Sequence, residues 1–147
     1  MEISFERASA GDALNIQNLY RQLVNDPNIH VDAEQILKIQ NDPYNFLLVA
    51  KIKGKLVGTA FLTLCQDVMY KDQPFGVLEN VIVDQAHQRL GIGCALMDYI
   101  KGLCKEHRCS KIMLLSSDKR KEAHLFFEKC GYVGNLKRAF VNYINRS

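Results

Sequence analysis

The sequence predicts a single domain of mixed α/β class, residues 1–147, in which a mixed sheet carries helices on both faces. Its length of 147 residues suits one domain with its own core. Strand-like segments follow one another directly in the first half, as hairpins do, whereas strand–helix–strand units fill the second half. Hairpins give antiparallel strands and the later units give parallel ones, so the sheet combines both kinds.

The first part of the chain is predicted to form a strand and two helices. Residues 3–7 alternate apolar and charged side chains, as a strand does. Asp12 can cap a helix over residues 13–23, whose apolar positions lie three and four apart on one face. A Pro-containing break at residues 25–28 ends this helix, and a second, short helix is expected over 32–40.

Three strands are expected next. Residues 46–51 and 56–64 are both rich in apolar side chains, and Lys53-Gly54-Lys55 between them is typical of a hairpin turn. Residues 77–83 form the third strand of this group.

The second half alternates strands and helices. We expect a helix from 91 to about 104, a strand over 111–116, a helix over 120–130 and a last strand over 139–144. These segments bring the sheet to six strands, and a seventh strand near Tyr132 is left open.

Composition excludes several classes of function. The balance of 48% apolar and 24% charged residues is that of an ordinary globular protein, and a net charge of +3 gives no surface for nucleic acid. No apolar run reaches the roughly 18 residues of a membrane span. Five cysteines, an odd number without a C-x-x-C pair, favour a reduced, cytoplasmic protein. The four histidines lack metal-ligand spacing, so no metal site is expected.

The most informative segment runs from Leu78 to Gly93. A predicted strand leads straight into a glycine-bearing loop that opens a helix. The first N–H groups of a helix lack partners within it and lie at the positive end of its dipole, so they attract anions. Gly91 and Gly93 leave room for a phosphate to approach the backbone. The segment therefore predicts a phosphate or pyrophosphate site.

Three phosphate-binding patterns can be compared with this loop. A dinucleotide fingerprint would need a third glycine where Leu96 stands, and a Walker loop would need Gly-Lys-Ser/Thr where the chain has Gly93-Cys94-Ala95. The pattern Gln/Arg-x-x-Gly-x-Gly/Ala fits residues 88–93 fully. An ordinary loop between a strand and a helix is the simpler alternative.

Several motifs in the correct order resemble the GNAT (GCN5-related) N-acetyltransferase family over nearly the whole chain. Glu79 lies on the strand, three apolar residues follow it, and the six-residue loop 88–93 opens the long helix. Further on, Phe126-Phe127-Glu128-Lys129-Cys130-Gly131-Tyr132 resembles the family's aromatic pair followed by Glu-Lys-x-Gly-Phe/Tyr.

The resemblance implies a mostly antiparallel sheet of six to seven strands and acetyl-CoA as the cosubstrate. The strands 77–83 and 111–116 would be the two central parallel strands and would splay apart. The pantetheine arm would pair with backbone groups in the opening, and the pyrophosphate would lie on N–H groups of the loop. The residues implied in acetyl-CoA binding are Val81, Ile82, Val83, Gln88, Arg89, Leu90, Gly91, Ile92, Gly93 and Cys94.

Glu79 is the candidate general base, acting directly or through water on the attacking amine. Alternation along a strand would place Glu79 on the same face as Val81 and Val83, with Asn80 on the opposite face. The chain departs from the family at Phe127, where many relatives carry a tyrosine that protonates the leaving thiolate. Tyr132, close by in the sequence, is the other candidate catalytic residue.

The resemblance implies direct transfer of an acetyl group to a primary amine, and we expect a small-molecule acceptor. A protein or peptide N-acetyltransferase and a non-catalytic CoA-binding module stay open as alternatives, as does a homodimer. Residues 116–120 and 123–126 also resemble the aminoalkylphosphonate acetyltransferase branch. Lys119 and Arg120 could meet an anionic group of the substrate or the 3′-phosphate of the cofactor, and a solvated helix start is the simpler alternative.

Overall fold

The computed structural model describes residues 2–145. The chain divides into two compact units between Met113 and Leu114. Short 3₁₀ turns at Ala10–Asp12 and Gln85–His87 supplement the regular elements. In chain order these are β1 (Ser4–Arg7), α1 (Ala13–Leu23), α2 (Ala33–Gln40), β2 (Asn45–Ile52), β3 (Lys55–Cys65), β4 (Phe75–Val83), α3 (Ile92–Glu106), β5 (Ile112–Leu114) and α4 (Lys121–Lys129).

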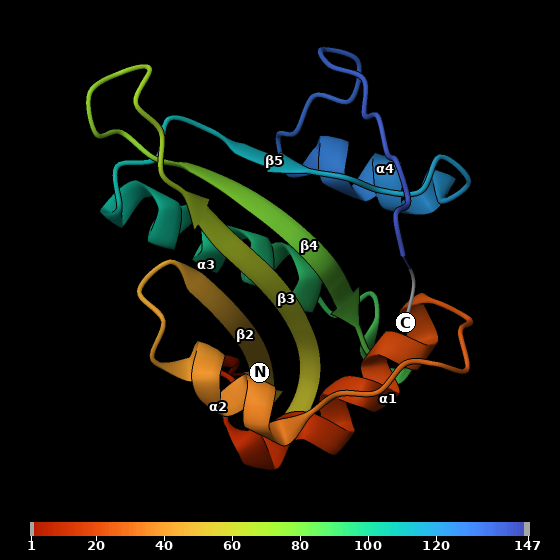
Figure 1. Cartoon of the computed structure of the whole chain (residues 1–147). Coiled ribbons are helices and arrows are strands. Elements are labelled where there is room, and N and C mark those ends of the chain that lie inside the picture. Colours follow the sequence, from red (N-terminus) through yellow and green to blue (C-terminus); the bar gives the residue numbers. More distant parts are fainter. Residues whose placement is uncertain (1, 146–147) are drawn as a thin grey trace. The chain divides into compact units, whose positions relative to one another are not determined.

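The strands form one mixed sheet in the order β1-β2-β3-β4-β5. Its strands β2, β3 and β4 run side by side in Figure 1. The pairs β1–β2, β2–β3 and β3–β4 are antiparallel. Two hydrogen bonds, from Gly76 N to Lys111 O and from Ser110 N to Pro74 O, both 2.9 Å long, join the approach to β5 to the beginning of β4. The opposite end of β4, which carries Val81–Val83, is the end at which the splay is predicted.

The predicted number of six to seven strands was wrong, because the described chain has five. Residues 139–144, expected to form the last strand, are irregular, and so is the chain around Tyr132. Phe140 and Ile144 are 89% and 91% exposed. A strand exists only when its backbone groups pair with a neighbouring strand, and no such ladder includes residues 139–144 in the described part of the chain.

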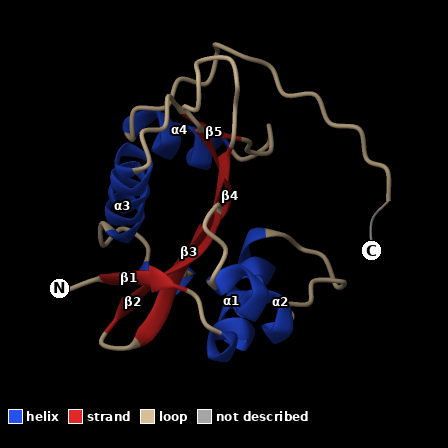
Figure 2. Ribbon diagram, turned by 60° about the vertical axis from the view of Figure 1, so that its left-hand side comes forward, coloured by secondary structure: helices blue, strands red, loops and turns tan. Residues whose placement is uncertain are grey.

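Helices cover both faces of the sheet in the first unit, as predicted (Figure 2). On one face, Ile16 and Leu19 of α1 and Ile36 of α2 pack against the sheet. Their partners there include Leu47 and Val49 of β2 and Ile82 of β4. On the other face, Ile92 at the start of α3 packs with Ala50 and Val57. The end of β4 and the start of α3 therefore rest on a packed core.

Two predicted features near the N-terminal half had different outcomes. The hairpin turn between β2 and β3 forms at Lys53 and Gly54, whose φ angles of 50° and 78° are the left-handed pair that a two-residue turn needs. The helix α1 has the predicted bounds, but the Asp12 side chain does not cap it. Instead its carboxylate accepts from Ser9 N at 2.9 Å and pairs with Lys51 Nζ at 3.2 Å.

The second unit contains α4, which ends as the sequence predicts. Gly131 has a φ of 94°, and Tyr132 N donates to Phe127 O at 3.0 Å, which closes the last turn. Over residues 2–145, no helix is both long and apolar enough to cross a membrane. The same residues contain no cluster of side chains suited to a metal ion. All five cysteines are free.

Candidate functional site

The loop between β4 and α3 presents a run of backbone N–H groups without acceptors. Gly91 precedes α3 and provides no side-chain cap, and the first turn of α3 contains no acidic residue. Over residues 2–145, the N–H groups from Arg89 to Cys94 make no hydrogen bond to another backbone group outside the helices and strands, and the next donor, Ala95 N, lies 3.1 Å from Gly91 O. Unpaired donors at the positive end of a helix are a site for an anion.

Two left-handed residues give this loop its shape. Arg89 has a φ of 66° and Gly91 a φ of 83°. Such residues turn successive N–H groups toward one side of the chain, as anion-binding loops require. A Cβ at position 91 would meet nothing within 4 Å, so the backbone angle rather than the lack of space explains this glycine. Leu90, between the two residues, is 51% exposed.

The strand β4 contains a bulge that the sequence did not predict. Glu79 pairs with Phe61 and Ile82 pairs with Thr59, so three steps on β4 match two on β3. Asn80, within the bulge, is left-handed with a φ of 55°. The predicted alternation was therefore wrong: the register places Glu79 on the face of Phe61 and Ile82, and not with Val83, which pairs with Gly58. Asparagine tolerates this conformation better than most residues, and this was the one available signal.

Asn80 shares the side of the sheet with Glu79, whereas the two were predicted to lie on opposite faces. Its side chain interacts with Tyr20 of α1, so it points toward α1. Burial raises the pKa of the Tyr20 hydroxyl, and the hydrogen bond from Asn80 opposes that rise. Tyr20 packs against the same core cluster that contains Ile82. Glu79 and Asn80 are themselves exposed, so a small molecule can reach both.

The predicted cofactor-binding residues differ in what their side chains do. Ile82 and Ile92 are 8% and 1% exposed and belong to the core, so only their backbone groups can contact a ligand. Gln88 and Cys94 are exposed. Gln88 Nε2 donates to Val83 O at 3.3 Å, which holds the loop against the end of β4.

A polar network at the start of the loop was missed by the sequence analysis. The Asp84 carboxylate accepts from Gln22 Nε2 of α1 at 3.0 Å and contacts His87 Nδ1 at 2.7 Å. Gln85 N donates to Gln22 Oε1 at 2.9 Å. The hydrogen bond from Gln22 lowers the pKa of Asp84, burial opposes this, and His87 lowers it further. Nothing in the sequence relates Gln22 to residues this far along the chain.

In the second unit, Tyr132 follows the end of α4 and is half-buried. Its ring lies edge-on to that of Phe127, with the centroids 6.4 Å apart. Phe127 itself is 8% exposed and contacts Phe126. These aromatic residues therefore form a small cluster, in which Tyr132 alone carries a hydroxyl group.

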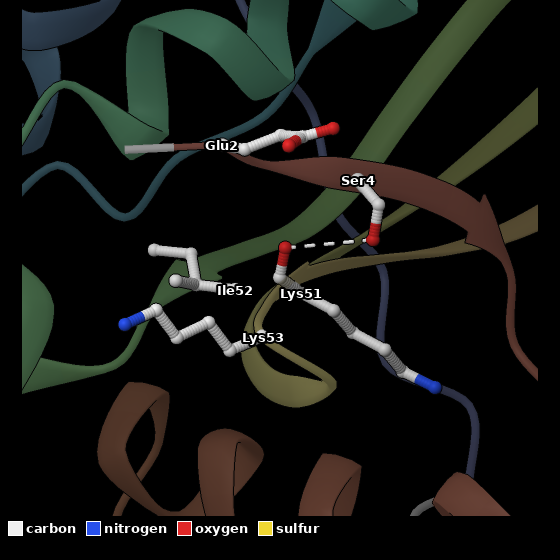
Figure 3. A pocket seen from close by; sticks show the side chains of 5 residues that line it. All are labelled: Glu2, Ser4, Lys51, Ile52 and Lys53. Atoms are coloured by element: carbon white, nitrogen blue, oxygen red, sulfur yellow. Dashed lines mark hydrogen bonds between the residues drawn. The ribbon is translucent and has the colours of Figure 1, made fainter.

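An open hollow of about 580 Å³ lies elsewhere, beside β1 and β2 (Figure 3). It is lined by Glu2, Ser4, Lys51, Ile52 and Lys53. The two lysine side chains point apart, and the ammonium of Lys51 is paired with Asp12 at 3.2 Å. Ser4 Oγ donates to Lys51 O at 3.5 Å, so these two polar groups are paired with each other, and the loop before α3 remains the candidate site.

Comparison with known proteins agrees with this site. The model of the acetyltransferase (GNAT) family matches residues 14–132, which include β4, the loop and α3. A glucosamine 6-phosphate N-acetyltransferase of Trypanosoma brucei brucei is 30% identical over 79 residues, which are 54% of this chain and 52% of that protein. The match thus spans about half the length of this curated relative.

Solved structures share the fold. A protein of Agrobacterium tumefaciens str. C58 that is classed as an acetyltransferase has a TM-score of 0.85 and 26% identity, with 95% of this chain and 99% of that chain covered. Glucosamine-6-phosphate N-acetyltransferase of Arabidopsis thaliana has a TM-score of 0.80 and 20% identity, with 99% and 100% covered. Neither structure supports the resemblance to aminoalkylphosphonate acetyltransferases.

Proposed function

We propose, since the chain belongs to the acetyltransferase (GNAT) family, that it transfers the acetyl group of acetyl-CoA to the primary amine of a small molecule. The observation that carries this proposal is the run of acceptor-free N–H groups from Arg89 to Cys94 at the start of α3. A pyrophosphate is the part of acetyl-CoA that such donors suit. The family match crosses the boundary at Met113, so we treat the whole chain as one catalytic domain.

The residues present fit acetyl-CoA as the cosubstrate, which supplies an acetyl thioester. Backbone N–H groups from Arg89 to Cys94 would hold its pyrophosphate, whereas the N–H of Gln88 donates to Gln85 O at 3.5 Å. Backbone groups of β4 from Val81 to Val83 would hold its pantetheine arm. The exposed side chains of Gln88, Arg89 and Leu90 stand at the same loop and can cover the bound phosphates.

Glu79 is the proposed base. An amine attacks a thioester only in its neutral form, so a proton must leave it during the reaction. Glu79 lies in the exposed bulge of β4, on the face that α1 and α2 cover, so an amine would approach from that face. Its exposure favours transfer of the proton through an intervening water. Phe127 cannot donate a proton to the departing thiolate, and Tyr132 is the proposed alternative donor.

A small molecule is the proposed acceptor class. The name of the Trypanosoma relative states that it acetylates glucosamine 6-phosphate, an amino sugar. We therefore place amino sugars and their phosphates first among the amines to be tested. Five free cysteines suit a reducing compartment, so we propose that the reaction takes place in the cytoplasm.

The test is release of the CoA thiol from acetyl-CoA in the presence of single amines, with amino sugars, polyamines, amino acids and short peptides in separate assays. Amine-dependent release with one of the small molecules is expected. Release with peptides alone would replace the proposed acceptor by a protein substrate. Tight binding of CoA without release in any assay would indicate a binding module.

Glu79→Gln should lower kcat by about 10²- to 10⁴-fold, the usual contribution of a general base, and change the affinity for CoA much less. The matched control is Glu106→Gln, which removes an exposed carboxylate at the far end of α3. Profiles of kcat against pH for both variants are the measurement. If Glu79→Gln keeps the height and acidic limb of the wild-type profile, the amine loses its proton to water without this residue.

A further inference from the structure

The end of α1 is fastened to the start of the candidate loop by one side chain. Gln22 Nε2 donates to Asp84 Oδ1 at 3.0 Å, and Gln22 Oε1 accepts from Gln85 N at 2.9 Å. A backbone N–H can only donate and a carboxylate can only accept, so these partners fix which end of the amide faces which residue. The bonds join residues 62 and 63 positions apart in the chain.

Asp84 connects Gln22 to the residues that precede the loop. Its N–H donates to Val57 O at 2.8 Å, which anchors it to β3, and its second oxygen lies 2.7 Å from His87 Nδ1. His87 N donates to Asp84 O at 2.8 Å, which closes the turn in between. The chain from Asp84 to His87 is therefore held in one conformation immediately before Gln88.

The loop is thus a short span between two anchors. Its far anchor is Ile92, which is 1% exposed and packs in the core. Its near anchor is the set of hydrogen bonds at Gln22, which is itself exposed. The direction of the acceptor-free N–H groups from Arg89 to Cys94 depends on both ends. Burial of the apolar anchor contributes more to the free energy of folding than the hydrogen bonds of an exposed amide do.

We propose that Gln22 is a positioning residue for acetyl-CoA: it holds the first residues of the loop so that the N–H groups converge on the pyrophosphate. This inference rests on the proposed function of the loop. It extends the cofactor site to α1, a helix on the opposite face of the sheet from α3 (Figure 2). Gln22 touches no ligand itself and acts through Asp84 and Gln85.

The helix α1 offers a matched control. Gln17 also accepts a backbone hydrogen bond with its side chain, from Val31 N at 3.0 Å, but it restrains the connection to α2 and not the candidate loop. Methionine has a side chain of similar length and good helix propensity without the amide, so Gln22→Met and Gln17→Met remove the same kind of interaction from the same helix.

The experiment is calorimetric titration of the whole chain with CoA, beside thermal unfolding of each variant. Gln22→Met should weaken CoA binding about tenfold, the effect expected if one backbone N–H of the loop loses its hydrogen bond to the charged pyrophosphate. Gln17→Met should bind CoA like the wild type, and both variants should unfold at similar temperatures. In turnover, Gln22→Met should raise KM for acetyl-CoA with little change in kcat.

A double-mutant cycle tests the route through Asp84. If Gln22 acts largely by holding this carboxylate, Gln22→Met combined with Asp84→Ala should weaken CoA binding by clearly less than the product of the two single losses. Any further loss beyond that of Asp84→Ala reports the remaining bond of Gln22 to Gln85 N. Wild-type affinity in Gln22→Met, equal losses in Gln22→Met and Gln17→Met, or additive losses in the double variant would each overturn the inference. A wild-type chain that does not bind CoA would overturn the proposed function as well.

Discussion

The first turns of α2 and α3 use the same backbone geometry in opposite ways. At α2, Asp32 Oδ1 accepts from Glu34 N at 3.0 Å, and Glu34 adds a carboxylate at the positive end of the helix. At α3, Gly91 has no side chain to cap the helix, and the first turn contains no acidic residue. The side chains at the start of α2 cap one of its donors and add a negative charge, whereas α3 has neither feature at its start. A helix start becomes a binding site when its own chain does not neutralise it.

A substitution that gives the start of α3 the acidic residue found at the start of α2 should cause the largest loss of CoA affinity. Glu34 is the second residue of α2 and Gly93 is the second residue of α3, so Gly93→Glu copies the self-neutralised arrangement. A carboxylate there repels the pyrophosphate, and we expect calorimetry to show CoA binding weakened by at least about 100-fold, or about 2.7 kcal/mol. The helix itself should stay intact, because glutamate favours helix starts.

The control for this variant is Gly102→Glu, which adds the same charge to the same helix. A Cβ at Gly102 would meet nothing within 4 Å, so the substitution fits without a steric clash. Gly102→Glu should bind CoA nearly as the wild type does. Equal weakening by both substitutions would show that net charge, and not the helix start, governs CoA affinity.

Substitutions of Gly91, the left-handed residue before α3, test the shape of the loop without adding a charge. At a φ of 83°, Gly91→Ala should lower the free energy of unfolding by about 1–2 kcal/mol, because a Cβ is unfavourable in this conformation. Gly91→Asn should lose less, since asparagine tolerates left-handed backbone. Urea denaturation of the two variants measures the difference. Equal stability of Gly91→Ala and wild type would mean that the loop relaxes to another conformation.

Removing the cap of α2 is the reciprocal experiment. Asp32→Ala should lower the free energy of unfolding by about 1 kcal/mol, the usual contribution of an N-cap. CoA affinity should not change, because Asp32 belongs to another helix. Chemical denaturation and calorimetry together provide the measurements. A loss of affinity would contradict the separation of the two helix starts.

The smallest expected effect is the loss of the stabilisation by Asp84 at acidic pH. Hydrogen bonding from Gln22 holds the pKa of Asp84 below its ordinary range, so its ionised form is favoured in the folded chain. The stabilisation is complete above the pKa of the unfolded chain and is lost as pH falls through the folded value, below about pH 4. The stability difference between wild type and Asp84→Asn should therefore shrink below that pH. If the stability difference between wild type and Asp84→Asn stays constant down to about pH 2.5, it arises from packing and not from the charge of Asp84.

Local features were predictable and distant ones were not. The bounds of α1 agree with the apolar period of residues 13–23, and the turn at Lys53 and Gly54 follows from residue types that accept left-handed backbone. The acetyltransferase (GNAT) family was recognised from motifs that lie within short segments, and the family match confirms it. Each of these signals is complete within a few neighbouring residues.

The errors have a common origin in pairing between separated segments. Residues 139–144 have the composition of a strand but no ladder partner in the described chain. The bulge at Asn80 depends on the register between β3 and β4, which no single strand encodes. The bonds of Gln22 link positions more than 60 residues apart. The roles of Glu79 and Tyr132 stay predictions, because they depend on where an acceptor binds.

The turn at Lys53 and Gly54 bears on the order in which the chain assembles. The hairpin of β2 and β3 joins neighbours in sequence, so closing it costs little chain entropy and it can form early. The hydrogen bond between Gln22 and Asp84 closes a loop of 62 residues, so we expect it to form late in folding. On that expectation, a molecule bound at the adjacent loop would stabilise contacts that are absent from the folding nucleus. Such a molecule slows the opening of the native chain and leaves its rate of formation nearly unchanged.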